Sequence, residues 1–140
     1  MRFIILIIAL ILSIPSSLAA EQQYTWPVIN VIDGDTIHIE MQELPLPLRK
    51  ILIRVNGVDT PEKGHLAKCQ REKDLSIKAT EFTKAFVKGR QVVFKNPKWD
   101  KYGGRIDADV YVNGKNLTEE LIKQGLGKAY DGGKKQSWCL

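Results

Sequence analysis

The first half of the chain has the hydrophobic pattern of β-strands. Residues 28–31 and 36–41 are rich in β-branched side chains, and the Asp-Gly pair at 33–34 between them predicts a hairpin. In residues 49–56, isoleucine and valine recur at every second position, with Leu52 as the one exception among the polar positions between them. The pattern therefore predicts three consecutive strands.

Between residues 68 and 88 the hydrophobic period lengthens to that of a helix. Apolar side chains recur at spacings of four, three and four residues, which places them on one face: Leu75, Ala79, Phe82 and Phe86. Gly89 is expected to end this helix, because glycine adopts the left-handed conformation that commonly follows a helix.

Two more strands and a second helix are expected in the last third of the chain. Residues 91–95 and 106–112 predict strands joined by the glycine-bearing loop 96–105. Asn116 with Glu119 three residues later resembles a capping box, and the buried side of the following helix should contain Leu117, Leu121 and Ile122. This order of elements predicts a mainly β fold with helices (β+α), a five-stranded and partly open OB-fold barrel flanked by two or three α-helices.

The N-terminus has the features of a signal peptide. Arg2 precedes a run from 3 to 14 that is apolar except for Ser13, and the small-x-small triplet at 17–19 suits signal peptidase. A membrane anchor is the alternative, although the run is shorter than the roughly 20 residues of a spanning helix. We expect residues 1–19 to be removed, residues 20–140 to form one domain, and the protein to be secreted or periplasmic.

Charge and cysteine content narrow the choice of partner and compartment. The chain has 21 basic and 16 acidic residues, and loss of Arg2 with the leader leaves 20 minus 16, a net charge of +4. Such an excess weakly favours a polyanionic partner. Cys69 and Cys139 are the only two cysteines, and in an oxidising compartment they are expected to form a disulfide. Two buried free thiols are the alternative.

The first candidate for chemistry is the acidic segment around Gly34. Taken alone, Asp33 and Asp35 could simply supply a turn. Strand parity, however, puts Asp35 on the same face as Ile37 and Ile39, and an unpaired carboxylate on an apolar face is costly. We therefore expect a metal ion or an arginine beside Asp35.

A second acidic cluster follows the third predicted strand. The carboxylates of Asp35 and Asp59, with a backbone carbonyl near Thr60, would form a hard oxygen site that suits calcium. Glu62 is near enough in sequence to act as a base beside it, although Thr60 could equally cap a turn begun by Pro61.

The loop at 100–105 is basic, aromatic and flexible, and an exposed hairpin is its alternative interpretation. Asp107 and Asp109 follow on one face of the fifth strand, where we expect them to face solvent.

The ordered set of these segments resembles the staphylococcal nuclease, or thermonuclease, family over residues 28 to about 130. The segments are 31–36, 54–62, 100–105 and 123–126, in the family's order and approximate spacing. The tail from Tyr130 to Cys139 resembles a Gram-negative and plasmid-borne branch. The resemblance implies an OB barrel with flanking helices, which agrees with the pattern above.

The resemblance also implies a calcium site and a residue that acts on water. Asp35 and Asp59 match the calcium carboxylates, and Thr60 matches the ligand that donates its main-chain carbonyl. Asp33 matches an acidic position next to the metal ligands. Glu62 matches the carboxylate assigned to activating or positioning the attacking water.

Substrate contacts are implied in the same way. Arg54 and Arg105 match the phosphate-binding arginines, with Arg105 aligned by its distance to the strand that follows because two glycines precede it here. Lys101, Tyr102 and Tyr130 match positions that line the nucleotide site.

The resemblance thus implies a calcium-dependent endonuclease that cuts DNA and RNA with little sequence specificity and leaves 3′-phosphate ends. We expect a monomer with no stable protein partner and, after signal cleavage, no membrane contact. Two alternatives stay open: an OB-fold module that binds nucleic acid or protein without catalysis, and a periplasmic barrel that binds saccharide or protein.

Overall fold

The structure, a computed structural model, describes residues 21–140, so the expected signal peptide at 1–19 lies outside the described residues. Within this part no helix is long and apolar enough to cross a membrane. The elements, in chain order, are β1 (Gln23–Tyr24), β2 (Val28–Asp33), β3 (Thr36–Glu40), η1 (Leu46–Leu48), β4 (Lys50–Val55), β5 (Val58–Asp59), η2 (Gly64–Leu66), α1 (Gln70–Val87), β6 (Val93–Trp99), β7 (Arg105–Val112), β8 (Lys115–Asn116), α2 (Leu117–Lys123) and β9 (Lys128–Ala129).

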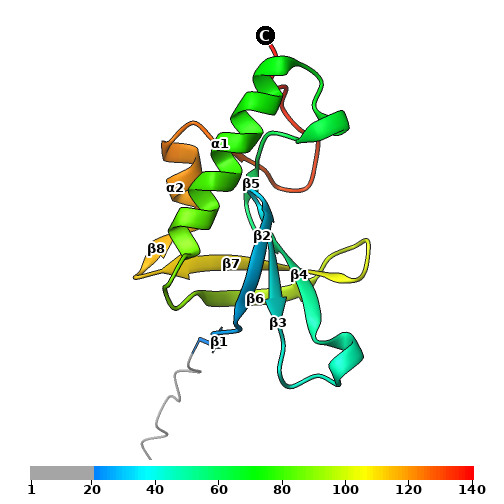
Figure 1. Cartoon of the computed structure of the whole chain (residues 1–140), viewed down its shortest axis with the longest axis vertical. Coiled ribbons are helices and arrows are strands. Elements are labelled where there is room, and N and C mark those ends of the chain that lie inside the picture. Colours follow the sequence, from blue (N-terminus) through cyan, green and yellow to red (C-terminus); the bar gives the residue numbers. More distant parts are fainter. Residues whose placement is uncertain (1–20) are drawn as a thin grey trace, which may run out of the picture.

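The five predicted strands form the body of one sheet. Its order is β1-β6-β7-β4-β3-β2, with β8 added to β7, while β5 and β9 form a separate pair. Neighbouring strands are antiparallel except β4 and β7, which run parallel. In Figure 1, β2 and β3 run crosswise to β6 and β7, so the sheet curls. The sheet is not closed, and the fold is the predicted mainly β, partly open OB type flanked by helices.

Alternating side chains of the curled sheet fill the core. Along β7 every second residue is buried, beginning at Ile106, as expected for a strand with one face inward. The largest completely buried side chains of the core are Phe94, Ile37, Ile39, Ile53, Leu117 and Leu121. Strands and helices of the described residues thus share one hydrophobic core.

Helix α1 forms close to its predicted bounds, but its buried face differs from the expected one. Gly89 follows the helix with a φ of 64°, as predicted for a terminating glycine. Leu75 and Phe82 are only partly buried, and the buried residues of α1 are Glu72, Ser76, Ala79, Thr83, Phe86 and Val87. The apolar periodicity missed this face because three of its residues are polar.

Helix α2 confirms its predicted cap and corrects one predicted core residue. The Asn116 side chain accepts hydrogen bonds from the main-chain N–H groups of Thr118 and Glu119. Leu121 is buried as expected, whereas Ile122 is 40% exposed. Ile122 lies about 100° around the helix from Leu121, on the side of α2 that is open to solvent.

The C-terminal tail returns to the beginning of α1 (Figure 1). Cys69, which precedes α1, is joined to Cys139 by a disulfide, as predicted. Trp138 beside it is buried, and the Lys128 ammonium lies 4.6 Å from the centre of its ring. The tail is therefore fixed to the body of the domain by a covalent bond and by side-chain packing.

We expect the disulfide to contribute substantially to stability, because it closes a long loop with a sequence separation of 70 residues. In the chain-entropy model such a crosslink stabilises by about 4 kcal/mol. Reduction should lower the melting temperature by about 10 °C or more. A Cys69→Ser/Cys139→Ser variant, as control, should not respond to the reductant. Two titratable thiols in the denatured, unreduced protein would contradict the bond.

Candidate active site

Asp35 lies at the turn between β2 and β3, with its carboxylate buried and paired. Arg54 on the neighbouring strand β4 places Nη1 2.7 Å from its Oδ2. The main-chain N–H of Thr60 donates to the same oxygen at 2.9 Å, and the Thr36 hydroxyl donates to Oδ1 at 3.2 Å. The partner expected for this carboxylate from strand parity is therefore an arginine in this structure.

These contacts do not fully offset the free-energy cost of removing the charged Asp35 carboxylate from water. Burial raises the pKa of Asp35 to about 6, and the negative charge of Asp33 adds to the rise, while Arg54 opposes it. Asp33, at the end of β2, also has a buried Oδ1 without a hydrogen-bond partner. This corner of the site therefore carries more negative charge than Arg54 balances, and a further cation would stabilise it.

Gly34 allows the acidic turn to lie close against its neighbours. A Cβ atom at this position would lie 2.8 Å from the Cβ of Ala79 on α1 and 2.9 Å from side-chain atoms of Thr60. The Gly34 carbonyl also accepts a hydrogen bond from the Thr83 hydroxyl of α1 at 2.7 Å. The glycine is thus required by close packing, and the polar face of α1 fixes the turn.

Asp59 ends the short strand β5 and is almost completely buried. Three groups approach it: Arg54 Nη2 lies 3.9 Å from Oδ1, the Trp138 indole N–H donates to Oδ2 at 3.3 Å, and Lys135 Nζ lies 2.8 Å from Oδ1. Arg54 therefore connects the two predicted calcium carboxylates, Asp35 and Asp59.

Glu62 follows on the same loop and is much more accessible. Its side chain is 36% exposed, compared with 4% for Asp59, and its Oε1 lies 2.8 Å from Lys135 Nζ. Buried Thr60 lies between the two acids in sequence. The structure thus separates the predicted ligands, which are buried, from the predicted water-activating carboxylate, which water can reach.

A buried acid on α1 holds this loop, and sequence reasoning missed it. Glu72 accepts hydrogen bonds from the main-chain N–H of Glu62 at 3.1 Å and from that of Lys68 at 2.7 Å. The only signal in the sequence was its place on the helical face that also contains Ala79 and Thr83. The carboxylate satisfies donors that the loop would otherwise bury without a partner.

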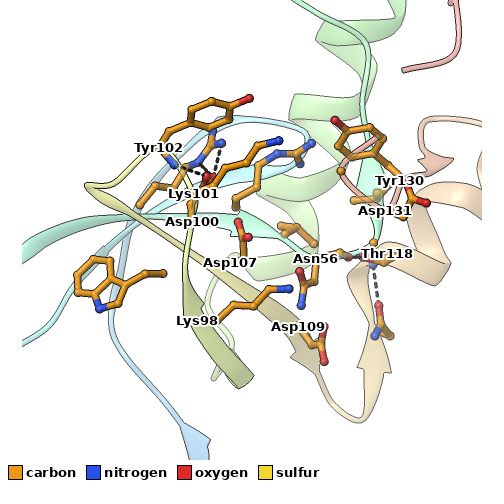
Figure 2. Close-up of a pocket in the computed structure, with 18 of the residues that line it drawn as sticks. Asn56, Lys98, Asp100, Lys101, Tyr102, Asp107, Asp109, Thr118, Tyr130 and Asp131 are labelled. Carbon is orange, nitrogen blue, oxygen red and sulfur yellow. Dashed lines mark hydrogen bonds and ion pairs between the residues drawn. The ribbon is translucent and has the colours of Figure 1, made fainter. Parts of the chain in front are cut away.

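Asp33, Asp35, Asp59 and Glu62 together form the acidic cluster of the site. A cavity of about 1040 Å³ lies beside it. Figure 2 shows Lys101 and Tyr102 on one side of it and Tyr130 with Asp131 on the other. The predicted phosphate and nucleotide residues that line it together are Arg54, Arg105, Lys101, Tyr102 and Tyr130. Asp35 and Asp59 do not line the cavity. Arg54 and Lys135 do line it, and they contact these two acids.

Three further residues belong to the cavity wall. Asp107 and Asp109 lie on the outward face of β7, as expected, and are half-buried where they line the cavity (Figure 2). Burial raises the pKa of Asp107, and the nearby Asp100 adds to the rise. The exposed Trp99 also lines the cavity. Sequence reasoning missed it because it lies just outside the recognised loop segment.

Arg105 is fixed by Asp100 at the base of the loop between β6 and β7. Its Nε donates to Asp100 Oδ2 at 2.6 Å, and its Nη2 contacts the same oxygen. Burial opposes the ionisation of Asp100, but the hydrogen bond from the Tyr102 N–H and the Arg105 guanidinium outweigh it and hold its pKa below the ordinary value. The pair orients Arg105 while leaving its side chain 30% exposed.

The acidic cluster fits a hard cation. Asp33 Oδ1 and Asp59 Oδ1 are buried without a hydrogen bond of good geometry, although Lys135 makes an ion contact to the second. Within residues 21–140, one group of three possible metal-ligand side chains has its ligand atoms within 4.8 Å of one another. This group is Cys69, Glu72 and Cys139, and its two cysteines are joined in the disulfide. A cation at the aspartates would thus need main-chain or water oxygens as further ligands, as calcium commonly takes.

Comparison with known proteins agrees with this architecture. Residues 52–137 match the family described as staphylococcal nuclease homologues. The chain is 33% identical over 132 residues to an uncharacterized protein of Methanocaldococcus jannaschii, covering 79% of this chain and 61% of that protein. It is 33% identical over 116 residues to the thermonuclease of Staphylococcus hyicus, covering 81% and 64%. It is 30% identical over 122 residues to endonuclease YhcR of Bacillus subtilis, covering 83% and 10%.

The chain belongs to the staphylococcal nuclease homologue family, since the matched region exceeds half its length. It spans less than two thirds of the length of each of these relatives.

We expect Glu72→Ala to destabilise the fold by about 1–3 kcal/mol, because it leaves two main-chain donors without their acceptor. Urea unfolding measures the effect. Glu81→Ala on the same helix, whose side chain is 64% exposed, serves as control and should change stability by less than about 0.5 kcal/mol. Equal stabilities for the two variants would show that Glu72 does not hold the loop.

Proposed function

We propose that the protein is a calcium-dependent nuclease that hydrolyses phosphodiester bonds in DNA and RNA. The observation that carries the proposal is the position of Arg54. Its guanidinium lines the cavity and also contacts Asp35 and Asp59, so it connects a space large enough for a nucleotide with the buried acids. The relatives in Staphylococcus hyicus and Bacillus subtilis are named a thermonuclease and an endonuclease, which supports the same activity.

In this proposal the buried acids hold the metal. Asp35 and Asp59 supply carboxylate oxygens, Thr60 supplies its main-chain carbonyl, and Asp33 adds negative charge beside them. Calcium, when bound, supplies positive charge that offsets the charge gained by the phosphate in the transition state. Hydrogen bonds from the Thr60 main-chain N–H to Asp35 and from the Trp138 indole to Asp59 hold the two carboxylates in place.

The arginines and Glu62 perform the remaining steps. Arg54 and Arg105 bind phosphate oxygens through planar guanidinium groups, which present two donors to an anion. Glu62, the accessible carboxylate, accepts or orients a proton of the attacking water. In-line attack with departure of the 5′ oxygen leaves 3′-phosphate and 5′-hydroxyl ends.

Substrate selection is proposed to be weak. Tyr102 and Tyr130 stand on opposite sides of the cavity (Figure 2), where they could stack on bases without reading their edges. Lys101 lies beside Tyr102, with Nζ 5.1 Å from the ring centre. We therefore propose action on both DNA and RNA with little sequence preference.

The setting is proposed to be outside the cytoplasm, in the periplasm or the medium. The signal-like residues 1–19 and the disulfide between Cys69 and Cys139 support export. We propose a monomer that needs no protein partner.

The direct experiment is digestion of labelled DNA and RNA with calcium and then with a chelator. We expect cleavage of both polymers in calcium and loss of cleavage with the chelator. Asp35→Ala and Asp59→Ala should each lower activity by about 10²-fold or more, because each removes an anionic ligand. Asp74→Ala, which removes an exposed carboxylate of α1, is the charge-matched control and should keep full activity.

Undiminished cleavage in the chelator, or normal turnover of Asp59→Ala at low calcium, would contradict the metal assignment. A protein that binds nucleic acid but cleaves neither polymer would instead be the inactive OB-fold binding module.

A further inference from the structure

Lys135 in the C-terminal tail bridges two acids of the candidate active site. Its Nζ lies 2.8 Å from Asp59 Oδ1 and 2.8 Å from Glu62 Oε1. The lysine side chain is 45% exposed, whereas that of Asp59 is 4% exposed. The ammonium therefore reaches inward from the surface and neutralises a buried charge and an accessible charge together.

The tail anchors Lys135 through the residues that follow it in the chain. After it, Trp138 donates its indole N–H to Asp59, and Cys139 is bonded to Cys69. Lys128 of β9 reinforces the arrangement, because its ammonium donates to the Ser137 carbonyl at 2.6 Å. Such anchoring lowers the entropy lost when a flexible lysine is held at one site.

The surroundings keep the lysine charged. The Asp59 and Glu62 carboxylates both lie at contact distance from the ammonium and favour its charged form. Lys134 next to it is exposed and makes no ion pair among residues 21–140. The two adjacent lysines thus have the same charge but differ in contact with the acids.

We propose that Lys135 is an internal counter-ion of the acidic cluster that competes with calcium for Asp59 and so sets the calcium affinity of the site. The inference rests on the proposed calcium-dependent function. A cation that binds Asp59 Oδ1 has to displace the ammonium from that oxygen, because the two positive charges cannot share it at contact distance. Without a bound cation, the ammonium offsets the repulsion between Asp59 and Glu62.

The competition predicts effects of opposite sign on stability and on calcium binding. Lys135→Gln should unfold at a lower temperature than wild type in a chelator, because Asp59 loses its cationic partner. The same variant should bind calcium about tenfold more tightly, since a positive charge near the site has been removed. A lysine with a purely structural role would weaken both properties when replaced.

The experiment is calorimetric titration of the intact, oxidised protein with calcium alone, together with thermal unfolding in a chelator. Lys134→Gln is the matched control, with the same charge change one residue away, and should resemble wild type in both measurements. Lys135→Arg keeps the charge and should keep the weaker calcium binding of wild type.

Equal calcium affinities for Lys135→Gln and Lys134→Gln would overturn the competition and leave the proposed function intact. Weaker calcium binding by Lys135→Gln would also overturn it. If neither wild type nor Lys135→Gln binds calcium, the proposed calcium dependence fails and the competition fails with it. Nucleic acid is absent from these titrations, so the two failures are distinguished without an activity assay.

Discussion

Asp35 places a carboxylate in the protein interior, where an unpaired charge would cost several kcal/mol. Arg54 on the adjacent strand and the main-chain N–H of Thr60 both approach its Oδ2. Gly34 has no side chain, and helix α1 therefore packs directly against the turn that carries this acid. The pairing of β3 with β4, the course of the loop after β5 and the position of α1 are all tied to this one buried charge.

Asp59 is a second buried carboxylate that requires charged or hydrogen-bonding partners, and some of these come from the surface. Arg54 connects Asp35 with Asp59, and Asp59 in turn receives the indole of Trp138 and the ammonium of Lys135 from the disulfide-anchored tail. Positive groups therefore come from the barrel on one side and from the C-terminus on the other. The tail therefore contributes charged and polar groups to the site as well as stability to the fold. The disulfide also helps to hold these groups in place.

Local patterns predicted most of the fold, because alternation and capping are read within a few residues: the five main strands, the Asn116 cap and the glycine after α1 are examples. Strand parity also predicted that Asp35 needs a positively charged partner, a metal ion or an arginine, and the structure places Arg54 there. The buried face of α1 did not, because Glu72, Ser76 and Thr83 are polar and are buried through hydrogen bonds, which hydrophobic periodicity cannot detect. The disulfide of the tail was expected from the two cysteines, but the contact of Lys135 with Asp59 was not, since nothing near Lys135 in the sequence indicates Asp59.

In the proposed function, the buried acids hold the cation and the accessible Glu62 acts on water. Glu62→Gln tests it directly, because glutamine keeps the shape but cannot accept a proton at neutral pH. Turnover at saturating substrate and calcium affinity should be measured on the same protein. We expect kcat to fall by about 10²-fold or more, the usual scale for a general base, while calcium affinity stays close to that of wild type. Unchanged kcat with a large loss of calcium affinity would make Glu62 a metal ligand and contradict the claim.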